Sequence, residues 1–377
     1  MSLRFVLLVS IVGVLVSTLA VVRFWSDFVP LSPAADISVD IEQIPDEEWQ
    51  TGQPQDLLVE LPLPPPVASL DGGIHVFQTF NNCGPAALSM ALSFHDTFIS
   101  QQELGQQLRP YQRPNGDNDD KSVTLSELRA IAEDRGFTAY HRPSGDIAMI
   151  EQFVSHGMPV ITRTWLRPGE DIGHYRVIKG YDRTQQLLFQ DDSLQGKGLA
   201  YKYEDFLDLW SAFNYEFLVV VPHGKQEIAE GILAERKDMK DAWQLALDLA
   251  NQQLSANSSD KYALFNQSVA HYYLGNYQQA VRAYEAVDEV LPNRMLWYQI
   301  EPLLAYYQIG DHTKVFELID GIFSSQNRAF SELYYLQGRM YLQQGRDELA
   351  QSAFEQARIY NTSEYWKANI VGLVEEQ

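Results

Sequence analysis

The chain has 377 residues, a formal net charge of -22 and hydrophobic residues at 45% of its positions. This length and composition predict a globular protein of two domains, each able to bury its own core, and exclude an intrinsically disordered chain. The acidic balance argues against nucleic acid as a partner, because binding to phosphates needs a basic surface.

Residues 1–25 are predicted to hold a membrane anchor. Phe5 to Val22 is an 18-residue run without a charge, preceded by Arg4 and followed by Arg23. The run exceeds the apolar core of a usual signal peptide, although Thr18-Leu-Ala20 leaves cleavage as the alternative. We therefore expect a single-pass protein of the cell membrane with extracytoplasmic C-terminal domains, or else a protein secreted after cleavage of the signal.

Residues 26–70 are predicted to form an acidic linker. The segment from Ser26 to Leu70 has no lysine or arginine and ends in the proline run Leu61-Pro-Leu-Pro-Pro-Pro66. A proline-rich run of this kind adopts an extended polyproline conformation and acts as a stiff spacer. A proline-motif ligand for a partner protein is the alternative interpretation.

The only cysteine of the chain, Cys83, lies where a polar segment gives way to Pro85 and a helical apolar pattern. A thiol at a helix N-terminus is favoured in its thiolate form by unpaired backbone N–H groups and by the helix dipole. Gln78, five residues earlier, could donate a side-chain N–H to the same place. Together with the Cys83 backbone N–H it would form an oxyanion hole.

Regular elements are predicted for most of the segment that follows. Periodicity and capping predict helices at Gln101–Leu108, Thr124–Arg135 and Ile147–Ser155, with a capping box from Thr124 to Glu127. A strand is predicted from Pro159, and the stretch from Pro110 to Lys121 is predicted to be a solvated polar loop.

Two further predicted strands bring a histidine close to a carboxylate. Tyr175–Tyr181 and Gln186–Gln190 both have strand character, with a turn between them. A three-residue turn would place His174 directly opposite Asp192, within reach of a hydrogen bond. A two-residue turn would shift the register by one and favour Asp191 instead, so both carboxylates stay open.

The last part of the chain, residues 225–377, has an internal repeat. Gly275, Gly310 and Gly345 lie 35 residues apart. A period near 34 with a glycine turn between two helices is typical of tetratricopeptide repeats, which build an all-α solenoid. Residues 226–256 are expected to form a partial or capping helix pair, and Ser363–Glu376 a terminal capping helix.

Four blocks within residues 71–224 resemble the C39-like branch of the papain-like cysteine peptidases. The blocks are Gln78 with Cys83-Gly-Pro-Ala86, Gly173-His174-Tyr175, Asp192-Ser-Leu-Gln-Gly196, and Tyr203 to Pro222. Ser193 departs from the family pattern, in which proline is commoner. The resemblance implies an α+β papain-like domain in which Cys83 is the nucleophile, His174 the base, Asp192 the orienting carboxylate and Gln78 an oxyanion donor.

The sequence thus favours a membrane-anchored, extracytoplasmic cysteine peptidase that acts on a peptide or protein substrate, with repeats that recruit a protein partner. The cysteine, histidine and carboxylate chemistry requires no metal or organic cofactor. Two alternatives stay open. One is an inactive peptide-binding adaptor, and the other is an acyl transferase that uses the same three groups, since one constellation serves several reactions.

Overall fold

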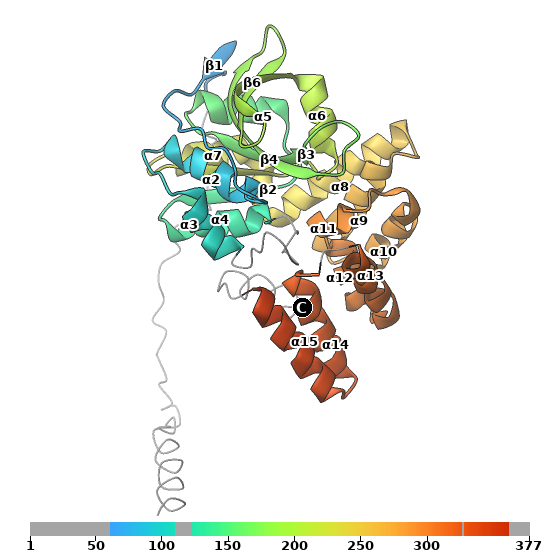
Figure 1. Cartoon of the computed structure of the whole chain (residues 1–377). Coiled ribbons are helices and arrows are strands. Elements are labelled where there is room, and N and C mark those ends of the chain that lie inside the picture. The colour runs from blue at the N-terminus through green and yellow to red at the C-terminus, as the bar shows by residue number, and fades with distance from the viewer. Residues whose placement is uncertain (1–60, 110–122, 326–327, 362–377) are drawn as a thin grey trace, which may run out of the picture. The chain divides into compact units, whose positions relative to one another are not determined.

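The computed structural model describes residues 61–109, 123–325 and 328–361 (Figure 1). The predicted anchor, the linker up to residue 60, the loop at 110–121 and the predicted terminal helix Ser363–Glu376 therefore lie outside the described residues. Within the described ranges, no helix has the length and apolar character needed to cross a membrane.

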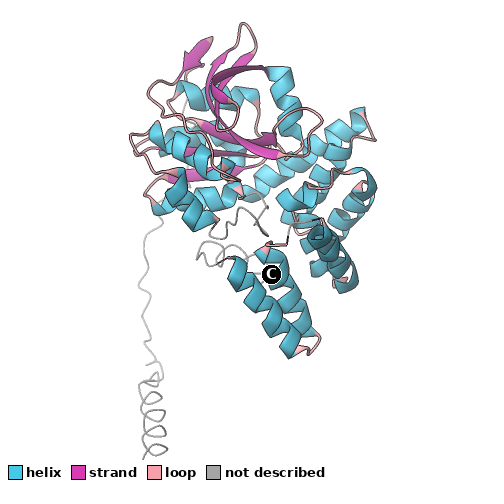
Figure 2. Cartoon of the chain, in the orientation of Figure 1, coloured by secondary structure: helices cyan, strands magenta, loops and turns pink. Residues whose placement is uncertain are grey.

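An antiparallel sheet forms the centre of the first part of the described chain (Figure 2). Its strands run in the order β2-β7-β3-β4-β5-β6, and β1 pairs with β4 beside this path. The strands are β1 (Val67–Ser69), β2 (Thr138–Arg142), β3 (Val160–Trp165), β4 (Gly173–Asp182), β5 (Leu187–Asp192), β6 (Gly196–Lys202) and β7 (Phe217–Val221).

Alternating side chains of the sheet enter two separate hydrophobic cores, because successive strand residues point to opposite faces. In β7, Leu218 and Val220 pack with α2 (Cys83–Ser93), α3 (Gln101–Leu108) and α4 (Leu125–Asp134). Phe217 and Val219 pack instead with α5 (Ile147–Ser155), α6 (Tyr203–Ser211) and α7 (Gln226–Leu233). The sheet is therefore covered by helices on both faces, and its central strands are buried.

Side-chain caps explain where several of these helices begin. The Thr124 and Glu127 side chains form the predicted capping box at the start of α4, and Ser100 and Asp146 cap α3 and α5. Each cap accepts a backbone N–H that has no partner within the helix. The three helices predicted in this region are confirmed.

The end of the predicted spacer takes part in the fold. Val67–Ser69 forms β1 and pairs with β4, and the preceding proline carbonyls also accept hydrogen bonds. The Tyr181 hydroxyl donates to the Pro65 carbonyl, and the Arg183 backbone N–H donates to the Pro66 carbonyl, both at 2.8 Å. Proline has no N–H to donate, but its carbonyl is a full acceptor, so the run can lie along a strand without joining the ladder.

The C-terminal part of the described chain is helical. Its helices are α8 (Met239–Ala256), α9 (Lys261–Tyr273), α10 (Tyr277–Glu285), α11 (Met295–Tyr298), α12 (Glu301–Gln308), α13 (His312–Ser324), α14 (Ser331–Gln343) and α15 (Asp347–Tyr360). Gly275, Gly310 and Gly345 separate α9 from α10, α12 from α13 and α14 from α15, with φ values of 76°, 79° and 67°. These left-handed conformations suit glycine and end one helix before the next begins.

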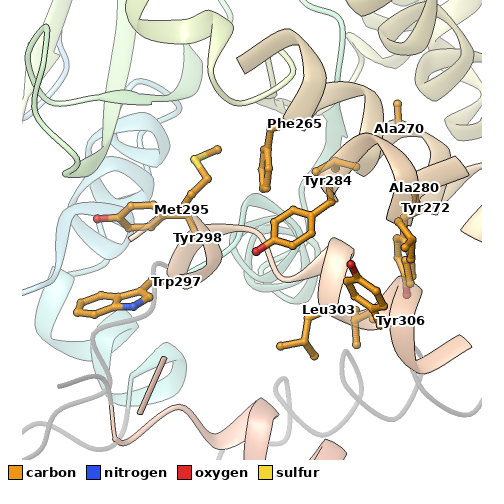
Figure 3. Close-up of a cluster of buried hydrophobic side chains, with 14 of the residues drawn as sticks. Phe265, Ala270, Tyr272, Ala280, Tyr284, Met295, Trp297, Tyr298, Leu303 and Tyr306 are labelled. Atoms are coloured by element: carbon orange, nitrogen blue, oxygen red, sulfur yellow. The ribbon is translucent and has the colours of Figure 1, made fainter. Parts of the chain in front are cut away.

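Several large aromatic side chains lie in the core of the helical part (Figure 3). Phe265, Tyr284 and Tyr306 belong to one buried cluster with Tyr298 of α11. Trp165 of β3 and Phe213 after α6 belong to the same cluster, and Tyr298 lies edge-on to both rings. A continuous apolar core therefore joins α11 to the sheet domain within the compact unit Leu57–Gln377.

Candidate active site

Cys83 is the first residue of α2, and its partly exposed side chain lines a cavity of about 520 Å³. The next residues, Gly84 and Pro85, are buried in the first turn, where proline is tolerated because its missing N–H would have no partner within the helix. The backbone N–H of Gly84 helps to lower the pKa of the Cys83 thiol. The thiol thus meets the positive end of the helix dipole, as its position in the sequence predicts.

His174 lies at the start of β4, between the thiol and a carboxylate. Its Nε2 is 2.9 Å from Oδ1 of Asp192, and its ring also makes a hydrogen bond with the Cys83 side chain. Because Nε2 faces the carboxylate, Nδ1 is the nitrogen left for the thiol. His174 and Asp192 are 2% and 0% exposed, so this pairing is shielded from water.

The predicted register of the two strands is wrong, although the predicted contact forms. Asp192 lies opposite Arg176, and not opposite His174. The turn spans four residues, 183–186, and a bulge between Ile178 and Gly180 shifts the ladder by one. Relative to the prediction, the turn and the bulge together move the partner of Asp192 by two residues, from His174 to Arg176. Because side chains alternate along a strand, a shift of two keeps His174 and Asp192 on the same face of the sheet. They are diagonal neighbours, within reach of a histidine side chain.

Further contacts fix the orientation of the Asp192 carboxylate. Oδ1 accepts the backbone N–H groups of Leu194 at 2.7 Å and Gln195 at 2.8 Å, and Oδ2 lies 3.5 Å from Nε of buried Arg176. Asp191, the alternative carboxylate, turns to the other face, where it pairs with Lys179 Nζ at 2.6 Å. The contact with His174 therefore distinguishes the two aspartates.

Gln78 lines the same cavity as the thiol and the imidazole. Ser193 holds it in place twice: the Ser193 hydroxyl donates to Gln78 Oε1 at 2.8 Å, and the Gln78 backbone N–H donates to the Ser193 carbonyl at 2.8 Å. Since Oε1 faces Ser193, the side-chain NH₂ group points away from it. The residue that departs from the family pattern thus contacts the predicted oxyanion donor.

The electrostatics of the three central groups are those of an ion pair. Burial opposes a thiolate, but the hydrogen bond and charge of His174 lower the pKa of Cys83 below its ordinary value. Burial likewise opposes an imidazolium, but hydrogen bonds with Asp192 and Cys83 raise the pKa of His174. Burial would raise the pKa of Asp192, yet the contact with His174 lowers it to about 2. All three directions favour thiolate, imidazolium and carboxylate together.

Two groups of cavity residues were missed by the sequence analysis. Arg109, directly after α3, lines the cavity and also lowers the pKa of the Cys83 thiol through its charge. Arg294, Trp297 and Tyr298 line it from the helical part of the chain. No motif distinguishes these residues, because their proximity to Cys83 arises only from long-range packing.

Comparison with known proteins shows that part of this chain is similar to C39-like peptidases. Residues 66–217 match the model of the Peptidase_C39 like family. A solved chain from Bacillus anthracis, whose description names a C39-like peptidase, is 16% identical with a TM-score of 0.36, and the match covers 42% of this chain and 98% of that one.

The peptidase domain of Streptococcus ComA, a bi-functional ABC transporter involved in a quorum-sensing pathway, is 19% identical with a TM-score of 0.31, and the match covers 40% of this chain and 98% of that one. No curated protein matches this chain.

Proposed function

We propose that this chain, whose residues 66–217 match the Peptidase_C39 like family, is a cysteine peptidase that hydrolyses peptide bonds with Cys83, His174 and Asp192. The observation that carries the proposal is the continuous contact from thiol to imidazole to carboxylate at the edge of a cavity. A thiolate of lowered pKa beside an imidazolium is the activated nucleophile that acyl transfer needs.

In the proposed mechanism the Cys83 thiolate attacks the carbonyl carbon of the substrate and a tetrahedral oxyanion forms. The Gln78 side-chain N–H and the Cys83 backbone N–H donate to that oxyanion. His174 then gives its proton to the leaving amine, and an acyl-enzyme remains. A water molecule, deprotonated by His174, releases the acid and restores the thiol, while Asp192 holds the imidazole in position.

The test is hydrolysis of a fluorogenic peptide library by the purified full chain, with Cys83→Ala as the matched variant. We expect turnover by the wild type and none above background by Cys83→Ala, with unchanged far-UV circular dichroism. Equal turnover by both chains would contradict the assignment of the nucleophile. A wild type that binds peptides without cleaving any of them would favour the adaptor alternative.

Hydrolysis and acyl transfer differ in their products. When an amine such as glycinamide is added in excess, hydrolysis yields the free acid, whereas acyl transfer yields the corresponding amide. Mass spectrometry distinguishes the two products, because the acceptor adds its own mass. We expect the free acid, and predominance of the amide would favour the transferase alternative.

We also propose the arrangement of the whole chain. Residues 1–25 would anchor it in the cell membrane, 26–70 would act as the linker, 71–224 would form the peptidase domain outside the cytoplasm, and 225–377 would form a tetratricopeptide array that recruits a protein partner. The uncharged run at Phe5–Val22 supports the anchor, and the 35-residue glycine spacing supports the array. Secretion after cleavage is the alternative for localisation.

A further inference from the structure

The cavity beside Cys83 has a wall that comes from the helical part of the chain. Asn293, Arg294, Trp297 and Tyr298, in α11 and just before it, all line it. Hydrogen bonds fix this wall: Arg163 Nη2 donates to the Tyr298 carbonyl at 2.7 Å, and the Tyr298 hydroxyl donates to the Asp171 carbonyl at 3.1 Å. The wall is therefore a built part of the cavity, able to contribute to the choice of substrate.

Arg109 lies in the same cavity with much of its hydrogen-bonding capacity unused. The residue is 4% exposed, and its Nη1 donates to the Asn81 carbonyl at 2.6 Å. Its buried Nε and Nη2 have no hydrogen-bond partner in the described part of the chain. A buried guanidinium without an anion is costly, and its flat fork of N–H donors matches a carboxylate.

Arg294 adds a second cation from the helical part. Its guanidinium lies 5.2 Å from the centre of the Trp297 ring, and the side chain lines the cavity. Neither Arg109 nor Arg294 forms an ion pair with a carboxylate among the described residues. Asp171, the one acidic residue among the described lining residues, reduces but does not cancel the two positive charges.

We infer that the cavity binds a carboxylate of the substrate through Arg109, with Arg294 as a second cation in the same cavity, so that the peptidase prefers acidic peptides. This inference rests on the proposed function for the identity of the ligand as a peptide. The carboxylate is either a glutamate or aspartate side chain or a free C-terminus. The whole chain is strongly acidic, with a net charge of -22. The cavity that contains the thiol differs, because two arginines without acidic partners make it locally positive.

The first experiment uses the single cysteine as a reporter. The thiolate displaces iodide from iodoacetyl-glycine, which carries a carboxylate, and from iodoacetyl-glycinamide, its neutral counterpart, and a thioether forms in both cases. The ratio of the two alkylation rates reports on a cation near the thiol. It cancels any change in the pKa of Cys83, since both probes react with the same thiolate.

We expect the wild type to favour iodoacetyl-glycine, and we expect Arg109→Gln to lower the ratio about tenfold, as loss of one charge-assisted hydrogen bond would do. Arg294→Gln should lower it by a smaller factor. Arg129→Gln is the matched control, because Arg129 pairs with Glu133 on the surface of α4. An equal ratio in wild type and Arg109→Gln, or an equal fall in the Arg129 control, would overturn the inference.

A second measurement needs no reactive thiol. In Cys83→Ala, glutarate should raise the melting temperature more than neutral glutaramide does, and the added Arg109→Gln change should abolish the difference. If the thiol is inert but this difference is found, the carboxylate site stands and the peptidase proposal fails. If peptides are cleaved but neither the ratio nor the melting temperature depends on Arg109, the peptidase stands and the carboxylate site falls.

Four matched peptides show whether the bound carboxylate is an acidic side chain or a free C-terminus. Kinetics with a Glu or a Gln side chain, each with a free or an amidated C-terminus, assign the preference to one carboxylate or the other. We expect the Arg109→Gln variant to lose the preference that the wild type shows. A wild type that cleaves all four peptides with the same kcat/KM would contradict the inference.

Discussion

Asp192→Asn should weaken both the fold and the reactivity of the thiol. The change keeps the shape of the side chain but removes the charge that faces His174 Nε2 and Arg176. The pKa of Asp192 falls from 3.8 to about 2 in the folded chain, because the contact with His174 outweighs burial. That difference of about 1.8 pH units corresponds to about 2 kcal/mol of stability.

The stability that the Asp192 carboxylate adds should depend on pH, because its pKa is lower in the folded chain than in the unfolded chain. The contribution is present above pH 3.8, the value of the unfolded chain, and is lost as the pH falls toward 2. The stability difference between wild type and Asp192→Asn, measured by urea unfolding, should therefore shrink by about 1 kcal/mol between pH 7 and pH 3. A difference that stays constant across this range would refute the electrostatic reasoning.

Alkylation by iodoacetamide measures the second effect. Without the carboxylate the imidazolium is less favoured, so the pKa of Cys83 should rise and the rate at pH 7 should fall, about tenfold for each pH unit of the rise. Asp191→Asn is the matched control, since Asp191 is also buried but pairs with Lys179. We expect it to lower stability and leave the alkylation profile unchanged. Equal profiles for the two variants would show that Asp192 does not act through His174.

Two other predictions concern Glu301 and Ser193. Burial and the charge of Glu216 raise the pKa of Glu301 from 4.5 to about 7, so stability should fall by up to about 3 kcal/mol as the pH rises between these values. Glu301→Gln should lose this slope in urea unfolding, and an unchanged slope would contradict the assignment. Ser193→Ala frees the Gln78 amide, so kcat should fall about tenfold with little change in KM. A fall in stability alone, with normal kcat, would argue against such positioning.

Local signals in the sequence were sufficient for the helix that carries Cys83 and for the three helices that follow it. Periodicity and caps predict α3, α4 and α5 because each has an apolar face and a side chain that accepts its first free N–H groups. The start of α2 at Cys83 follows from Pro85 and the apolar pattern after it, because Asn82 makes no side-chain cap there. A helix that begins at a cysteine needs no distant partner to place its sulfur at the helix N-terminus.

The register of β4 and β5 could not be predicted in this way. The bulge lies beside Gly180, which pairs with Ser69 of β1, and an added Cβ at Gly180 would lie 3.0 Å from the Ala68 carbonyl oxygen. The close approach of a strand from the predicted spacer thus accompanies the irregularity. A strand from a proline-rich segment gives no periodic signal of its own, so neither the pairing nor the bulge is visible locally.

The wall formed by α11 makes the order of synthesis relevant to the proposed activity. Cys83, His174 and Asp192 leave the ribosome long before Arg294, Trp297 and Tyr298, which complete the cavity. Domains fold as units from the N-terminus during translation. A nascent chain that ends before α11 would already contain Cys83, His174 and Asp192 but would lack these lining side chains. If the proposed activity is correct, its selectivity should therefore be complete only in the finished chain.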